Sequence, residues 1–76
     1  MSDNVYRLIK VTGSSTESVA DAIRKGVAAT AETVDDVEWF EVTSIRGHVT
    51  DGSVEHFQVT MEIGHRAGEQ SGSGAA

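Results

Sequence analysis

Trp39 and Gln58 are the two side chains whose chemical types and positions best suit the binding of a small ligand. Trp39 is the only tryptophan in the chain and lies in an extended stretch, on the alternation face that it shares with Glu41, Thr43 and Ile45. An indole presents about 150–250 Å² of surface that resists exposure to water, so its place on a sheet face without a covering helix indicates stacking against another ring or another subunit. Gln58 adds an amide that both donates and accepts hydrogen bonds.

The first half of the chain predicts a strand followed by a helix. Residues 5–12 are rich in β-branched and aromatic side chains, which favours a strand. Ser14 and Glu17 have the spacing of a capping box, in which each side chain binds a free backbone N–H group at a helix start. Apolar residues then recur at three- and four-residue steps opposite charged ones, which predicts an amphipathic helix over residues 16–33. Gly26 lies inside this pattern and indicates close packing there.

The second half predicts a long β-hairpin. Asp51-Gly52 is a strong signal for a two-residue turn, and it joins extended stretches at residues 37–49 and 53–65. We therefore expect an α+β fold of β-α-β-β order, in which a three-stranded antiparallel sheet is wrapped on one face by a single helix. The third strand is expected between the first and the second.

The turn also predicts which residues face each other across the hairpin. On the apolar face the predicted pairs are Phe40–Ile63, Val42–Met61, Ser44–Val59 and Arg46–Phe57, and on the other face they are Trp39–Gly64, Glu41–Glu62, Thr43–Thr60 and Ile45–Gln58. Gln58 then lies six residues along the hairpin from Trp39, or roughly 20 Å at about 3.3 Å per residue. Both side chains can contact one small ligand only if they come from different copies of the chain.

Several short stretches, in their order and spacing, resemble the signature of the dodecins, small flavin-binding proteins of bacteria and archaea. The stretches are Trp39-Phe40-Glu41-Val42, Ser44-Ile45-Arg46-Gly47, Phe57-Gln58-Val59, Gly64 and Arg66. The resemblance covers nearly the whole chain apart from its C-terminal end. It implies a hollow homododecamer of cubic symmetry, in which paired flavins lie at a twofold contact.

The resemblance also implies roles for individual residues. Trp39 takes the position that stacks on the flavin, and Gln58 the position that hydrogen-bonds the polar edge of the isoalloxazine. Arg46 and Arg66 match basic positions near the phosphate end of a bound nucleotide, and arginine suits phosphate because of its forked donors. Glu38 counts among the cofactor-binding residues and stands where an aspartate is expected, just as His65 stands where a large apolar side chain is expected.

The resemblance does not decide which flavin binds. Riboflavin, FMN and FAD share the ring on which Trp39 would stack, and the two arginines favour FMN. Coenzyme A is a further possible ligand of the arginines.

Composition excludes several other classes of function. Twelve acidic and six basic residues give a formal net charge of -6, which disfavours binding to nucleic acid. The chain has no cysteine, which excludes disulfides and thiolate metal sites. No apolar stretch approaches the roughly 18 residues of a membrane span, so the cytoplasm is the expected location. A 76-residue chain removes only about 60% of its unfolded surface from water, which favours self-association.

Catalytic and metal sites are weakly indicated. Glu41 and Glu62 face each other, but Lys10 or Arg7 on the first strand would neutralise such a pair in a structural network. His48 and His56 are predicted on opposite faces of the sheet, which argues against a zinc site. No nucleophile with an adjacent base is evident. We therefore assign no catalytic and no metal-binding residues and expect no enzymatic activity.

The sequence thus predicts a single domain over residues 1–66 and a disordered tail over residues 67–76, which are rich in small and polar side chains. The predicted function is storage and buffering of flavin, FMN or riboflavin, by aromatic stacking at a subunit interface of a homododecamer. The alternative is a structural oligomeric module that binds coenzyme A or another nucleotide and has no role with flavin.

Overall fold

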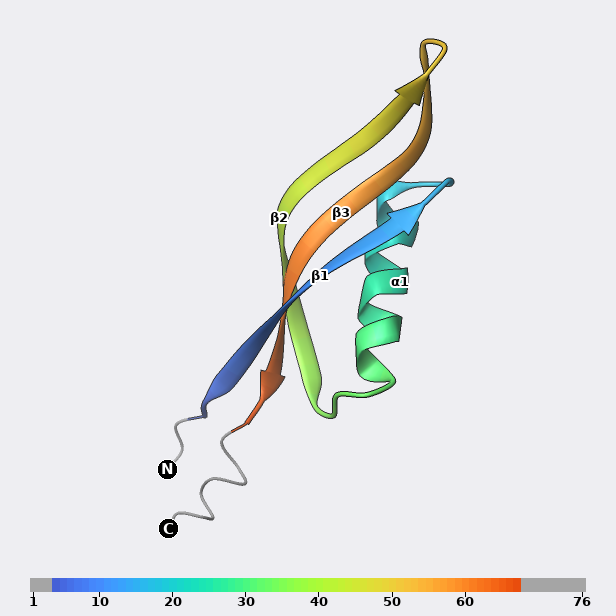
Figure 1. Ribbon diagram of the computed structural model, residues 1–76. Coiled ribbons are helices and arrows are strands. Elements are labelled where there is room, and N and C mark those ends of the chain that lie inside the picture. The colour runs from blue at the N-terminus through green and yellow to red at the C-terminus, as the bar shows by residue number, and fades with distance from the viewer. Residues whose placement is uncertain (1–3, 68–76) are drawn as a thin grey trace.

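The computed structural model describes residues 4–67, which form three strands and one helix. The elements are β1 (Tyr6–Ser15), α1 (Val19–Ala31), β2 (Val37–Thr50) and β3 (Ser53–Arg66). The strands pair in the order β1-β3-β2, both pairs are antiparallel, and α1 covers one face of the sheet (Figure 1). The predicted α+β fold of β-α-β-β order is therefore confirmed, including the central place of β3.

The hydrophobic core lies between α1 and the central strand. Four side chains have no exposed surface: Ala22, Val59, Met61 and Ile63. Partly buried apolar side chains surround them: Val11, Val19, Ile23, Val27, Val37 and Val42. The three core residues of β3 alternate along the strand, so β3 turns its odd-numbered residues to the helix and its even-numbered ones to the opposite face.

Two glycines let the helix approach the sheet closely. The space that a Cβ on Gly13 would need is held by the backbone carbonyl of Ala22. A Cβ on Gly26 would lie 2.8 Å from the Cε atom of Met61, so the predicted close packing at Gly26 is confirmed.

The helix begins three residues later than predicted. β1 continues through Gly13 to Ser15, because this stretch pairs with β3 up to Phe57. The N-cap is Ser18, whose hydroxyl accepts a hydrogen bond from the backbone N–H of Asp21 at 3.0 Å. The Ser14 capping box is therefore wrong. Ser18 and Asp21 have the same spacing, and strand pairing decides between the two serines.

The hairpin turn has the predicted chemistry. Asp51 and Gly52 both have positive φ angles, 52° and 78°, which is what the tight turn between two antiparallel strands requires. The pairing of β2 with β3 also matches the prediction from Trp39 to Val42.

Between Val42 and Val49 the register differs from the prediction because β2 contains a bulge. Thr43 is left without a partner, so Ile45 pairs with Val59 and Arg46 pairs with Gln58. Four predicted pairs are therefore wrong: Thr43–Thr60, Ser44–Val59, Ile45–Gln58 and Arg46–Phe57. A bulge inserts one residue into one strand, and here it moves residues 44–48 to the other face until a further irregularity between His48 and Val49 restores the predicted pairing.

The protomer is elongated. Its principal extents are 58 × 20 × 13 Å and its radius of gyration is 15.8 Å, compared with about 11 Å for a compact domain of this length. The β2–β3 hairpin reaches well past the end of α1 (Figure 1), and it exposes apolar side chains such as Val49 and Val54. A single protomer therefore leaves apolar surface that another chain can cover.

Ala67 is the one residue of the predicted C-terminal tail, residues 67–76, that lies within the described residues. Ala67 donates its backbone N–H to the carbonyl of Val5 at 2.8 Å, so this residue still belongs to the ordered edge of the sheet. Residues 68–76, which make up most of the predicted tail, lie outside the described residues.

Candidate ligand-binding site

The sheet face away from α1, called the open face below, carries most of the predicted site. The strand registers assign to it Tyr6, Leu8, Lys10, Thr12 and Ser14 from β1, His56, Gln58, Thr60, Glu62, Gly64 and Arg66 from β3, and Trp39, Glu41, Ser44, Arg46 and His48 from β2. It is largely polar, with one large ring system near one end.

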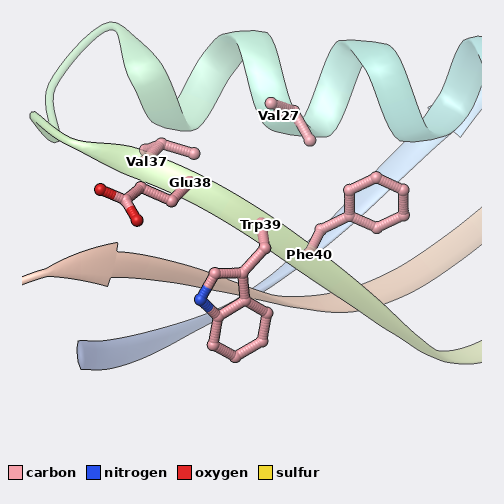
Figure 2. A pocket seen from close by; sticks show the side chains of 5 residues that line it. All are labelled: Val27, Val37, Glu38, Trp39 and Phe40. Carbon is pink, nitrogen blue, oxygen red and sulfur yellow. The ribbon is translucent and has the colours of Figure 1, made fainter. Parts of the chain in front are cut away.

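Trp39 lies on the open face against Gly64. Figure 2 shows its indole on the side of β2 away from α1, whereas the ring of Phe40 lies on the helix side. The Cε2, Cζ2 and Nε1 atoms of the indole occupy the space that a Cβ on Gly64 would need. The side chain nevertheless remains 40% exposed. The indole is therefore supported from below by backbone while part of its surface stays open to a ligand or another chain.

Tyr6, Glu38 and Arg66 surround the indole. The ring of Tyr6 meets that of Trp39 edge to face, with centroids 6.2 Å apart and an angle of 67° between the planes. Glu38 is the extra residue of a second bulge in β2, between Val37 and Trp39. Its carboxylate accepts hydrogen bonds from the Tyr6 hydroxyl at 3.1 Å and from the Arg66 guanidinium at 2.7 Å.

This ion pair affects the chemistry of Arg66. The negative charge of Glu38, which also accepts a hydrogen bond from Arg66, raises the pKa of Arg66 above its ordinary value. Because Glu38 already neutralises it, an anion that binds here must share Arg66 with the carboxylate.

Gln58 and Arg46 form the second part of the candidate site. The Thr43 bulge turns Arg46 to the open face, directly opposite Gln58, instead of leaving it beside Phe57. Ser14 lies on the other side of Gln58. An amide, a guanidinium and a hydroxyl therefore form one row across the three strands, which suits hydrogen bonding to a polar ligand.

The two parts are far apart within one protomer. Gln58 lies six residues along β3 from Gly64, the partner of Trp39, or roughly 20 Å at about 3.3 Å per residue. Trp39, Glu38 and Arg66 are thus together at one end of the open face, and Gln58 and Arg46 are together further along. A small ligand that contacts both groups must lie between two copies of the chain.

A cleft of about 140 Å³ adjoins the indole on the helix side. It is lined by Val27, Val37, Glu38, Trp39 and Phe40 (Figure 2). Its walls are mostly apolar, and it lies between α1 and the outer strand of the sheet.

The structure corrects the prediction that His48 and His56 lie on opposite faces of the sheet. His48 and His56 are direct partners on the open face, with parallel rings whose centroids are 5.6 Å apart. The expectation that they lie on opposite faces was wrong, because it ignored the Thr43 bulge. Within residues 4–67 no group of three or more metal-ligating side chains is found.

The acidic pair on the open face is as predicted. Glu41 lies opposite Glu62, and Lys10 lies opposite Glu62 on the other side. A cation beside two facing carboxylates reduces their repulsion, which fits the structural interpretation of this pair.

Comparison with known proteins identifies the family. The family model described as dodecin matches residues 5–67. The dodecin of Thermus thermophilus is 35% identical over 65 residues, which are 86% of this chain and 94% of that protein. This chain belongs to the dodecin family.

Solved dodecins also share the fold. The dodecin from Streptomyces davaonensis is 41% identical with a TM-score of 0.81, covering 87% of this chain and 97% of that one. The dodecin from Streptomyces coelicolor is 40% identical with a TM-score of 0.82, covering 88% and 96%. The family resemblance inferred from the sequence is confirmed. Like other dodecins, the chain is a small ligand-binding protein that forms homo-oligomers.

Two residues of the candidate site were given no role by the sequence reasoning. Tyr6 contacts Trp39 and Glu38, and Gly64 makes room for the indole. The signal for Gly64 was present, because the predicted register placed it opposite Trp39. Nothing in the sequence linked Tyr6 to Trp39, since their contact depends on where the β1 register ends.

Within the described part of the chain, no helix is long and apolar enough to cross a membrane.

Proposed function

We propose that this dodecin stores and buffers flavin, FMN or riboflavin, by stacking the isoalloxazine on Trp39 at an interface between subunits of a homododecamer. The proposal depends on the indole of Trp39, which lies against Gly64 and remains partly exposed. This indole is far from Gln58 and Arg46 of the same chain. Two flavins paired at a twofold contact between two indoles would cover this exposed surface. Base-on-aromatic stacking contributes about 1–3 kcal/mol per ring.

The remaining residues complete the site in this proposal. Gln58 from a neighbouring subunit hydrogen-bonds the polar edge of the isoalloxazine, because an amide can both donate and accept there. Arg46 lies directly opposite Gln58 and is exposed, so it is free to approach the phosphate of FMN. Glu38 holds Tyr6 and Arg66 around the indole. No step of this function converts the flavin chemically, so the protein is proposed as a binding protein and not as an enzyme.

A flavin titration with two matched variants tests the proposal. Adding the assembled protein to FMN or riboflavin should strongly reduce flavin fluorescence, and Trp39→Ala should abolish most of that reduction. Phe40→Leu is the control, because it removes a neighbouring aromatic ring from the opposite face of β2. Flavin fluorescence that stays unchanged with a large excess of protein would refute flavin binding.

Two further measurements address assembly and the alternative ligand. Light scattering should give the mass of twelve chains, and a stable monomer that still binds flavin would refute the interface site. Coenzyme A binding that persists in Trp39→Ala, without flavin binding by the parent protein, would instead support the structural nucleotide-binding module.

A further inference from the structure

The ring of Tyr6 lies against the ring of Trp39 near one end of the open face. Both side chains are on the open face and both are partly exposed, Tyr6 at 38%. Their rings meet edge to face with centroids 6.2 Å apart. Aromatic side chains in such contact can exchange an electron directly, because no other group separates them.

The hydroxyl of Tyr6 has a base within hydrogen-bond distance. It donates to the Oε1 atom of Glu38 at 3.1 Å, which is inside the range over which a positioned carboxylate accepts a proton. Phenols lose their proton when they lose an electron, so oxidation of a tyrosine needs such an acceptor. Glu38 provides it from the residue next to Trp39.

We propose that Trp39, Tyr6 and Glu38 form a radical relay, in which a one-electron hole on the indole passes to the phenol while the phenolic proton passes to Glu38. The oxidant is a photoexcited, oxidised flavin stacked on Trp39, so the physiological source of the hole rests on the proposed function. The relay itself requires only that Trp39 has lost one electron.

The relay balances in three steps. A photoexcited, oxidised flavin bound on Trp39 would act as the one-electron oxidant, and loss of that electron would leave an indole radical cation. The indole then takes one electron from Tyr6 and the phenolic proton moves to Oε1 of Glu38, which gives neutral indole, a phenoxyl radical and a protonated carboxyl. Return of one electron from the oxidant to the phenoxyl radical, with return of the proton from Glu38 to the phenolic oxygen, would restore Tyr6 and Glu38.

Arg66 favours the return of the proton. Its guanidinium donates to Oε2 of Glu38 at 2.7 Å, so protonation of Glu38 removes a charge-assisted hydrogen bond. Return of the proton to Tyr6 restores this hydrogen bond to full strength, so the relay is reversible. Its effect is to move the hole away from the flavin for a short time without consuming any group.

The composition of the chain makes the relay directly measurable. The sequence has one tryptophan and one tyrosine, so an indole radical reports only on Trp39 and a phenoxyl radical only on Tyr6. Pulse radiolysis with azide radical oxidises the indole without any flavin. The experiment therefore tests the relay separately from flavin binding.

In the parent protein the indole radical should decay while the phenoxyl radical rises at the same rate, and this rate should not depend on protein concentration. In Tyr6→Phe, which keeps the ring and removes the hydroxyl, the indole radical should persist. Trp39→Phe measures the phenoxyl formed by direct attack of the azide radical. Equal decay of the indole radical in the parent protein and in Tyr6→Phe would overturn the relay.

The role of Glu38 is tested by Glu38→Gln. The amide oxygen can still accept the hydrogen bond from Tyr6, but it is no longer a base, so transfer should slow by at least about tenfold. An unchanged rate would remove Glu38 from the relay. Assemblies mixed from Trp39→Phe and Tyr6→Phe subunits should show no transfer, because no chain then has both rings, and transfer in them would overturn the pathway within one subunit.

These outcomes separate the relay from the proposed function. Transfer without flavin binding would support the relay and refute the flavin site. Flavin binding that depends on Trp39, without transfer to Tyr6, would support the site and refute the relay.

Discussion

Replacing Gly64 by alanine should weaken flavin binding without a direct change to any group that touches the ligand. A Cβ at this position would lie 2.7 Å from the Nε1 atom of Trp39 and closer still to two of its ring carbons. The indole is 40% exposed on the open face, so it can swing outward instead of forcing the strands apart. We therefore expect a stability cost of about 1 kcal/mol, at the low end for overpacking.

The effect on binding should be larger than the effect on stability. If the displaced indole loses its stacking on the isoalloxazine, the loss is about 1–3 kcal/mol, which corresponds to a Kd about 5- to 150-fold higher. The assay is a fluorescence titration of FMN with the parent protein and the variant. The free energy of unfolding is measured in parallel by denaturant titration.

Gly47→Ala is the matched control for Gly64→Ala. It makes the same substitution in the same hairpin, but a Cβ at Gly47 would approach the His56 carbonyl at 3.0 Å and no part of Trp39. This control should keep the parent affinity. An unchanged Kd and unchanged quenching in Gly64→Ala would refute the conclusion that the indole must lie against Gly64 to bind.

Three further predictions concern the helix and the polar row. Gly13→Ala should destabilise the fold by roughly 1–3 kcal/mol or more, because its Cβ would overlap the Ala22 carbonyl, and thermal unfolding measures this. The hydrogen bond from Ser15 lowers the pKa of Asp21, so the stabilisation from ionised Asp21 is complete above the ordinary pKa of 3.8 and is lost as the pH falls through the lower pKa of the folded state. Denaturant titration should therefore show that Asp21→Asn loses less stability at acid pH than the parent protein does. Equal losses of stability in the two proteins would exclude this role of Asp21. Gln58→Ala should raise the Kd for flavin about fivefold, the net value of one hydrogen bond, with the oligomer unchanged in light scattering.

Most of the fold was predictable because its local signals agree with one another. The alternating residues of β3, the helical periodicity and the Asp51-Gly52 turn each favour the same arrangement, and the structure confirms it. The start of α1 was not predictable in the same way. Ser14 and Ser18 each precede an acidic residue by three positions, and only the pairing of β1 with β3 decides between them.

The site was less predictable because one unpaired residue changes the face of the residues that follow it, here as far as His48. Trp39 and Gln58 were expected on the open face, and their registers place them there. Arg46 was expected beside Phe57, and the Thr43 bulge moves it opposite Gln58. Nothing in a run of β-branched and polar residues marks which one leaves the ladder, so the sequence alone could not reveal the bulge.

The contacts of Glu38 also depend on a bulge that the sequence did not reveal. The sequence counted Glu38 among the cofactor-binding residues and marked it as a departure from the expected aspartate, but it did not predict the contacts with Tyr6 and Arg66 that the structure shows. A glutamate is one methylene longer than an aspartate, and the bulge between Val37 and Trp39 gives it a position outside the regular alternation.

The long hairpin and the small core should make the stability of this dodecin depend on its own concentration. Among residues 4–67 of one protomer, four apolar side chains are fully enclosed, while the far end of the hairpin leaves valines in contact with water. Folding and association then form one equilibrium, so the melting temperature should rise as total protein concentration rises. A substitution at the hairpin tip, far from the indole, would be detected first as a loss of binding capacity upon dilution.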